Sequence, residues 1–130
     1  MTVLEEIGPS RYVSLVTYRR NGTPVATPVW HVMRDGVLIV VSDADAGKVK
    51  RIRNDARVTV TVCDFRGRVA PGARSAEGTA RLLDEADTQA ARRLLAGKYL
   101  MSRLGAWATR ILRIRRPPVI GISVTFPDAG

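Results

Sequence analysis

Two dipeptides that favour tight turns do most to limit how this chain can fold. Asn21-Gly22 and Asp35-Gly36 both tolerate the positive φ angles that two-residue β-hairpin turns require. The segments beside them are rich in β-forming residues, and they either alternate apolar with polar side chains or run almost wholly apolar. We therefore expect three consecutive antiparallel strands, at Arg11 to Tyr18, Thr23 to Val32 and Val37 to Ser42.

The second of these expected strands contains two prolines. Pro24 and Pro28 have no N–H group to donate to a neighbouring strand. They therefore predict an edge strand, a bulge, or a stretch whose backbone faces something other than a strand.

The rest of the chain predicts further strands and late helices. Ala46 to Asn54 should form a short helix, because Val49 and Ile52 are spaced i, i+3 on one face. Asp84 suits the N-cap of an amphipathic helix, and Leu104 to Ile111 continues a helical stripe. More strands are expected at Arg57 to Asp64, Ala76 to Leu83 and Val119 to Phe126. Six strands with two or three helices indicate an α+β, mainly β, antiparallel barrel in one domain over residues 1–130.

Size and cysteine content narrow the class of protein. A chain of 130 residues, 45% of them hydrophobic, can bury a single core. Lone Cys63 cannot form an internal disulfide, which favours a reducing cytoplasm. The acidic start, with Glu5 and Glu6, does not resemble a signal peptide, and no apolar run reaches the roughly 20 residues of a membrane span.

The net charge of +9, from 21 Lys and Arg against 12 Asp and Glu, attracts anions without saying which. Nucleic acid, an anionic membrane surface, a phosphorylated cofactor and an acidic substrate all stay open. The most specific feature is a group of cations at the opening of the expected helix, where free N–H groups and the helix dipole favour an anion. The alternative is a solvated, charged helix face. The cations are Lys48, Lys50, Arg51 and Arg53.

Several kinds of catalytic site are disfavoured. His31 is the only histidine, so no multi-ligand metal set is expected, and a histidine that lines the barrel or lies on the surface is favoured over a catalytic one. Cys63 is expected to be a small buried residue. Asp45 to Val49 lacks the first glycine and the Ser or Thr of a P-loop, which excludes a nucleotide triphosphatase.

In their order along the chain, these segments resemble the flavin and deazaflavin oxidoreductases of the split β-barrel, pyridoxamine-phosphate-oxidase-like superfamily. Arg11 to Val32 resembles the family's opening hairpin, in which a Gly-x-Pro turn leads to an x-Pro-Val-Trp strand beside the cofactor ring. Asp43 to Val60 resembles its phosphate-binding segment, although Ala56 replaces the usual proline and Arg51 stands where many relatives have Asn. The resemblance implies an FMN-binding type of split barrel that forms a homodimer with two cofactor sites at the interface.

The resemblance also implies roles for individual residues. Lys48 would bind the cofactor phosphate, helped by Lys50 and Arg51, and Ser42 would contact the ribityl or phosphate portion. Four consecutive residues would line the cofactor ring: Thr27, Pro28, Val29 and Trp30.

The subgroup that uses the deazaflavin coenzyme F420 resembles this chain most, in its compact length and in two stretches, Ser42 to Asp55 and Cys63 to Val69. This implies an enzyme that passes a hydride between the deazaflavin and a small organic substrate. Arg66, Arg68 or the Arg-rich stretch after Arg103 could meet the cofactor's acidic tail. No general acid is assigned, since core packing is the expected role of Tyr12, Tyr18 and Tyr99.

Two alternatives remain beside this hypothesis. The same fold could hold FMN, as an oxidase, a reductase or a flavin-binding protein. A non-enzymatic module could instead place Leu104 to Arg116 on an anionic membrane or on nucleic acid, although a helix that packs in a dimer is favoured for this stretch. We therefore expect no nucleic-acid partner and at most a weak contact with a membrane surface.

Overall fold

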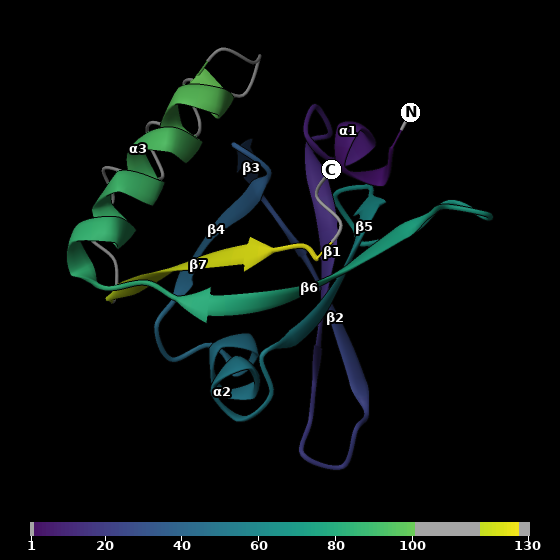
Figure 1. Cartoon of the computed structure of the whole chain (residues 1–130), viewed down its shortest axis with the longest axis horizontal. Helices are drawn as coiled ribbons and strands as arrows, with labels where there is room; N and C mark the ends of the chain where they lie inside the picture. The colour runs from purple at the N-terminus through teal and green to yellow at the C-terminus, as the bar shows by residue number, and fades with distance from the viewer. Residues whose placement is uncertain (1, 101–117, 128–130) are drawn as a thin grey trace.

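The computed structural model describes residues 2–100 and 118–127, and its centre is one antiparallel sheet of seven strands (Figure 1). The order across the sheet is β2-β1-β5-β6-β7-β4-β3. The strands are β1 (Tyr12–Tyr18), β2 (Pro24–Val29), β3 (Val32–Arg34), β4 (Val37–Asp43), β5 (Arg57–Cys63), β6 (Ser75–Leu82) and β7 (Val119–Thr125). The described helices are α1 (Val3–Ile7), α2 (Gly47–Asn54) and α3 (Glu85–Leu100).

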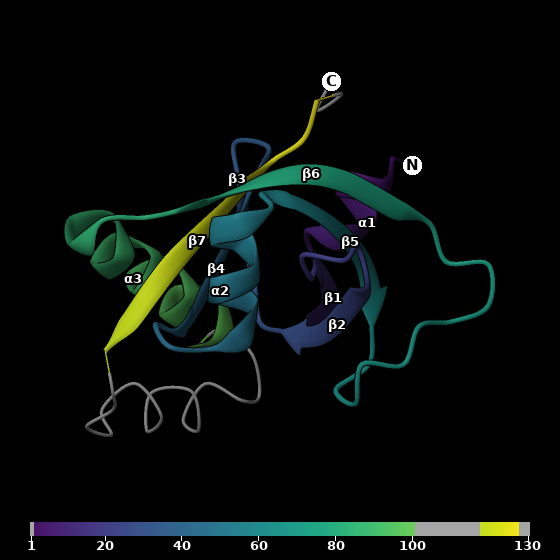
Figure 2. The ribbon, with the colours of Figure 1, turned by 90° about the horizontal axis from the view of Figure 1, so that it is seen from below.

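The two edge strands of the sheet, β2 and β3, follow each other directly in the chain. Only Trp30 and His31 separate them. Consecutive Cα atoms are about 3.8 Å apart, so Val29 and Val32 lie at most about 11 Å from each other. The sheet must therefore curl until its edges approach at this corner, which gives an open, barrel-like shell (Figure 2).

Two helices close the ends of this shell. Alternate side chains of the strands point inward and form the core, in which Leu15, Val60 and Ile122 are fully buried. Helix α1 adds Ile7 at one end, and α2 adds Val49 at the other end (Figure 1). The ends of the shell are thus sealed by side chains from outside the sheet.

The third helix lies outside the shell. Helix α3 packs on β7, β4 and β3 (Figure 1). Near its start, the Thr88 hydroxyl accepts a hydrogen bond from the Gly121 N–H at 2.8 Å, so helix and strand approach closely. No described helix covers the outer face of β2, β1, β5 and β6.

The structure corrects two features of the predicted fold and confirms a third. The sheet has seven strands, not six, because the expected strand Thr23 to Val32 breaks at Trp30 and His31. Helix α1, with five residues, was not predicted. The prediction of an edge for the proline-containing strand is confirmed by β2. The expected helical stripe Leu104 to Ile111 lies outside the described residues.

Candidate functional site

Helix α2 begins just after buried strand β4, and no side chain caps its first turn. Its N-cap residue, Ala46, has no side-chain oxygen that could accept from the first amides of the helix. The positive end of the helix dipole lies at the same place. The start of α2 is therefore well suited to an external acceptor such as an anion.

Arg51 folds back over this helix start. Its Nε donates to the Thr17 hydroxyl oxygen at 2.6 Å, and Thr17 is fully buried in β1. A Cβ atom placed on Gly47 would lie 2.9 Å from Arg51 Nη1, so the guanidinium occupies the space that the glycine leaves open. Strand β1 thus anchors the guanidinium beside the first turn of α2.

Lys48 shares this region with Arg51. Burial lowers the pKa of Lys48 below its ordinary 10.5, nearby Asp43 raises it, and the positive charge of Arg51 lowers it further. Two cations that are partly withdrawn from water and repel each other are stabilised by an anion that contacts both. Gly47, Lys48 and Arg51 together form what we call the cation cluster.

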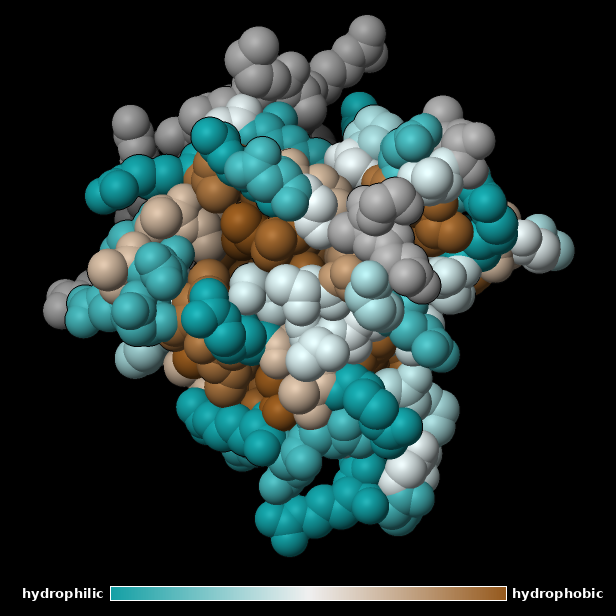
Figure 3. All heavy atoms as spheres, in the orientation of Figure 1, coloured by the Kyte–Doolittle hydropathy of each residue, from teal (hydrophilic) through white to brown (hydrophobic). Residues whose placement is uncertain are grey.

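The other predicted cations lie further out. Lys50 and Arg53 are exposed on α2. The turn between β1 and β2 lies beside the end of this helix, since Arg20 Nη2 donates to Asn54 Oδ1 at 3.4 Å. Hydrophilic side chains gather at this end of the molecule, below the sheet in the view of Figure 3. The structure thus joins Lys48 with Arg51 and leaves Lys50 on the solvated surface.

Ser42 lies inside the shell. Its side chain is 6% exposed, and its Oγ donates to the Asp43 carbonyl oxygen at 3.1 Å. A cofactor would therefore have to reach a buried hydroxyl whose proton is already donated within the chain.

The four predicted ring-lining residues occupy different faces of the edge strand. Thr27 pairs with Leu15 and shares the inner face, as does buried Val29, whereas Pro28 is exposed on the outer face. Trp30 follows the end of β2 and packs against Leu95 of α3. The four side chains therefore do not share one face of β2.

A rigid turn lies against this edge. Asp64 Oδ1 accepts from the N–H groups of Arg66 and Arg68, each at 2.9 Å, and these bonds lower the pKa of Asp64. Gly67 at the centre has φ 84°, and a Cβ atom there would lie 3.4 Å from the Pro28 ring. Two arginines are therefore held near the β2 edge, with Arg68 already ion-paired to Asp64 at 2.9 Å.

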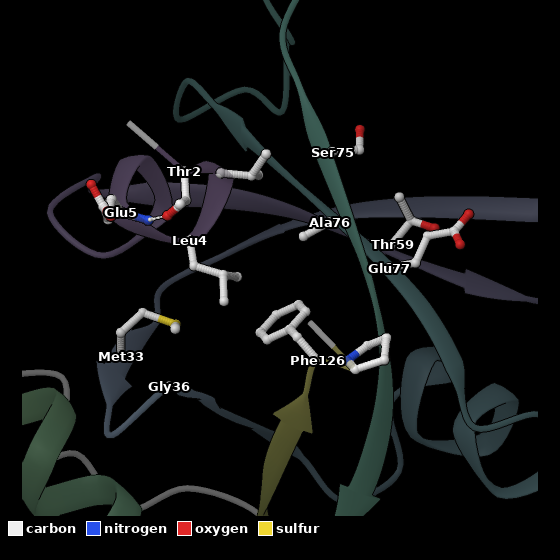
Figure 4. A pocket seen from close by; sticks show the side chains of 12 residues that line it. Thr2, Leu4, Glu5, Met33, Gly36, Thr59, Ser75, Ala76, Glu77 and Phe126 are labelled. Carbon is white, nitrogen blue, oxygen red and sulfur yellow. Dashed lines mark hydrogen bonds between the residues drawn. The ribbon is translucent and has the colours of Figure 1, made fainter. Parts of the chain in front are cut away.

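A separate hollow of about 730 Å³ lies at the opposite end of the shell, beside α1 (Figure 4). Leu4, Met33 and Phe126 point toward one another across it, whereas Glu5 and Glu77 point away. In the view of Figure 3, which has the orientation of Figure 1, hydrophobic residues are visible in the middle of the molecular surface. None of the predicted cofactor-binding residues lines this hollow.

Sequence reasoning missed the surroundings of the only histidine. His31 is fully buried at the corner between β2 and β3, near Lys98 of α3. Burial, followed by the charge of Lys98, lowers the pKa of His31 from 6.5 to about 4. Burial also lowers the pKa of Lys98 to about 8, so it is an ammonium at neutral pH. A lysine in the last turn of a helix is too common to have indicated this contact.

Two other site classes receive no support from the described part of the chain. No group of three or more His, Cys, Asp or Glu residues there could hold a metal ion. No helix among those residues is both long and apolar enough to cross a bilayer. The Arg-rich stretch from Arg103 to Arg116 lies outside the residues that the structure describes.

Comparison with known proteins identifies the fold. The sequence profile of the pyridoxamine 5'-phosphate oxidase family matches residues 2–126. No curated protein matches the sequence.

Solved structures share the fold over nearly the whole length of this chain. A conserved hypothetical protein from Mycobacterium tuberculosis has a TM-score of 0.70 at 20% identity, covering 98% of this chain and 81% of that one. An F420 reductase has a TM-score of 0.60 at 22% identity, with 94% and 91% covered. A FAD-binding protein from Mesorhizobium loti has a TM-score of 0.66 at 15% identity, with 98% and 90% covered. These likenesses confirm the predicted split-barrel fold.

Proposed function

The chain belongs to the pyridoxamine 5'-phosphate oxidase family, and from this membership we propose that it is an oxidoreductase that binds the deazaflavin coenzyme F420. We propose further that the cation cluster at the start of α2 holds the cofactor phosphate and that the open edge of β2 borders the ring.

The observation that carries this proposal is that two cations, Lys48 and Arg51, lie near each other at the start of α2. Burial disfavours the charge of Lys48, nearby Asp43 offsets part of this cost, and Arg51 adds a smaller repulsion, while the Thr17 hydroxyl accepts from Arg51 and holds it beside the helix start. The first amides of α2 add hydrogen-bond donors that point the same way. Donors and charges of this kind fit a phosphate group.

The protein's own part in the reaction is to bind and orient. When bound, the deazaflavin would supply hydride transfer to or from a small organic substrate. Prolines 24 and 28 leave β2 with two fewer backbone donors, which suits an edge that faces a flat ring rather than another strand. The fixed turn from Asp64 to Arg68 would border the same edge and limit access of water.

We also propose that the chain acts as a homodimer through the outer face of β2, β1, β5 and β6, which no described helix covers. Cross-strand registers place small side chains side by side there, and Ser14 and Thr61 are already less than a tenth exposed. A flat face of small side chains allows a second sheet to approach closely. The β2 edge would then lie beside the partner, which would complete the site.

Titration with each cofactor tests the proposal. Wild type should bind coenzyme F420 saturably, followed by deazaflavin fluorescence, and Lys48→Ala should raise the Kd by about tenfold or more, because a charge-assisted bond to phosphate is lost. Arg93→Ala, which removes an exposed cation from α3, is the matched control and should bind like wild type. An unchanged Kd for Lys48→Ala would refute the phosphate assignment.

FMN is the second candidate cofactor. It is supported by the fold that this chain shares with a FAD-binding protein, since FAD and FMN are both flavins. The same titration with FMN separates the two. Saturable FMN binding with no F420 binding would replace the deazaflavin by a flavin and leave the role of the cation cluster in place.

A further inference from the structure

One ammonium group ties three separate segments of the chain together at the corner between β2 and β3. Lys98 Nζ donates to the carbonyl oxygens of Gly8 at 3.2 Å, Ser10 at 2.8 Å and His31 at 2.9 Å. Gly8 and Ser10 belong to the link between α1 and β1, whereas His31 lies in the two-residue connection from β2 to β3. An ammonium has three N–H donors, so its hydrogen-bonding capacity is matched by these three carbonyls.

The imidazole of His31 fixes the same corner from inside. Its Nε2 lies 2.8 Å from the Ile7 carbonyl oxygen, which can only accept, so Nε2 carries the proton. The Ser10 hydroxyl donates to the same carbonyl at 2.6 Å. Lys98 Nζ and His31 Nε2, 3.3 Å apart, are then both donors, and burial, followed by the charge of Lys98, keeps the imidazole neutral.

A second contact from α3 reaches the neighbouring residue of the corner. Leu95 precedes Lys98 by three positions and therefore lies on the same helix face. It packs against Trp30, Val32 and Val41. Helix α3 thus holds the Trp30 side chain through an apolar contact and the His31 backbone through a charge-assisted hydrogen bond.

We infer that Lys98 is a positioning residue for the cofactor ring: its ammonium fixes the corner at which β2, the strand proposed to border the ring, ends. The inference rests on the proposed function. As an edge strand, β2 is paired with β1 alone, and the tight turn to β1 fixes only its Pro24 end. The Val29 end pairs with Val13 of β1 on one side and is held beyond that pair by the corner, so loss of the Lys98 ammonium would loosen that end.

The test compares Lys98→Met, which keeps an unbranched apolar stem, with Lys98→Gln, which retains a donor, and with the control Arg93→Met on the exposed side of α3. Each Kd for coenzyme F420 and for FMN is measured well below the unfolding temperature of that variant. For the cofactor that wild type binds, we expect Lys98→Met to raise the Kd about tenfold. Lys98→Gln should raise this Kd less, and Arg93→Met should leave it unchanged. If Lys98→Met does not fold, Lys98→Gln carries the comparison.

Hydrogen exchange without cofactor gives the second readout. The amides of His31 and Val32 should exchange faster in both Lys98 variants than in Arg93→Met. A lower unfolding temperature with unchanged Kd and unchanged exchange at the corner would overturn the inference, because Lys98 would then be a general stabilising residue. If wild type binds neither cofactor, the proposed function fails. Independently of that result, amide exchange of His31 and Val32 that is as slow in the Lys98 variants as in Arg93→Met would overturn the positioning role.

Discussion

Arg51 Nε donates to the hydroxyl oxygen of Thr17 across 2.6 Å and so joins two residues that are 34 positions apart in the chain. Thr17 lies in β1 and is fully buried, whereas Arg51 extends from α2 back over Gly47. The orientation of Arg51, which is proposed to bind the cofactor phosphate, therefore depends on the Thr17 hydroxyl inside the barrel.

Thr17→Val tests this dependence, since it keeps the shape of the side chain and removes the acceptor. We expect a loss of about 1–2 kcal/mol in the free energy of unfolding, because a hydrogen bond to a charged group disappears at a buried position. The Kd for the bound cofactor should rise as well. Urea denaturation and cofactor titration measure the two effects, with Thr125→Val at an exposed strand end as the control. Equal affinity in wild type and Thr17→Val would show that Arg51 needs no anchor.

The buried imidazole should make stability depend on pH. The pKa of His31 falls from 6.5 to about 4 in the folded protein, so the unfolded chain binds more protons between these values. The free energy of unfolding should therefore fall as the pH is lowered through this window, by up to about 1.4 kcal/mol per unit. His31 is the only histidine, so His31→Gln should flatten the dependence in urea titrations at several pH values. The same slope in His31→Gln would assign the effect to carboxylates.

Gly78→Ala should be strongly destabilising. A Cβ atom at this position in β6 would lie 2.7 Å from the backbone oxygen of Thr125 and 2.7 Å from a methyl group of Val124. Strands β6 and β7 would have to separate locally, which we expect to lower the unfolding free energy by about 1–3 kcal/mol. Thermal unfolding measures the change, and a variant as stable as wild type would show that the two strands tolerate this shift.

Gly97→Ala should have the opposite effect. Gly97 lies within α3, and a Cβ atom there would meet nothing within 4 Å. Alanine should raise the unfolding free energy by up to about 1 kcal/mol through its higher helix propensity. The unfolding of Gly97→Ala is measured under the conditions used for Gly78→Ala. Comparison of the two variants separates the effect of steric contact from that of adding a methyl group. A loss of stability would contradict the open surroundings of this residue.

The proposed dimer predicts a charge-sensitive interface. Val16 lies on the outer face between Ala26 and Thr59. Val16→Glu should shift sedimentation from dimer toward monomer, because a desolvated carboxylate without a partner is unfavourable at an interface. Gln89→Glu, exposed on α3, should leave the oligomeric state unchanged. A wild-type monomer at micromolar concentration would contradict the dimer itself.

Local patterns were enough to predict most elements of the fold. The two turn dipeptides, the alternating strands and the short helix with Val49 and Ile52 all have causes within a few residues of sequence. The break at Trp30 and His31 could not be read this way, since apolar side chains continue through it. It arises because β2 and β3 lie on opposite edges of a curled sheet, a relation that depends on all the other strands.

In the candidate site, too, local features were predictable from the sequence and contacts between distant residues were not. Lys48 and Arg51 were predicted together from their place at a helix start, and the structure brings them close. The Thr17 anchor and the Lys98 contact with His31 join residues that are distant in sequence, and neither follows a local pattern. Whether Thr27, Pro28, Val29, Trp30 and Ser42 meet a cofactor stays a prediction.

The prolines of β2 have a consequence for solubility at high concentration. A sheet that does not close keeps two free edges, and an unprotected edge can recruit the same strand of another molecule into a growing aggregate. Pro24 and Pro28 remove two of the donors that such recruitment would use, on the longer of the two edges. The residues that suit this strand to a ligand thus also reduce its capacity to pair edge to edge with another molecule.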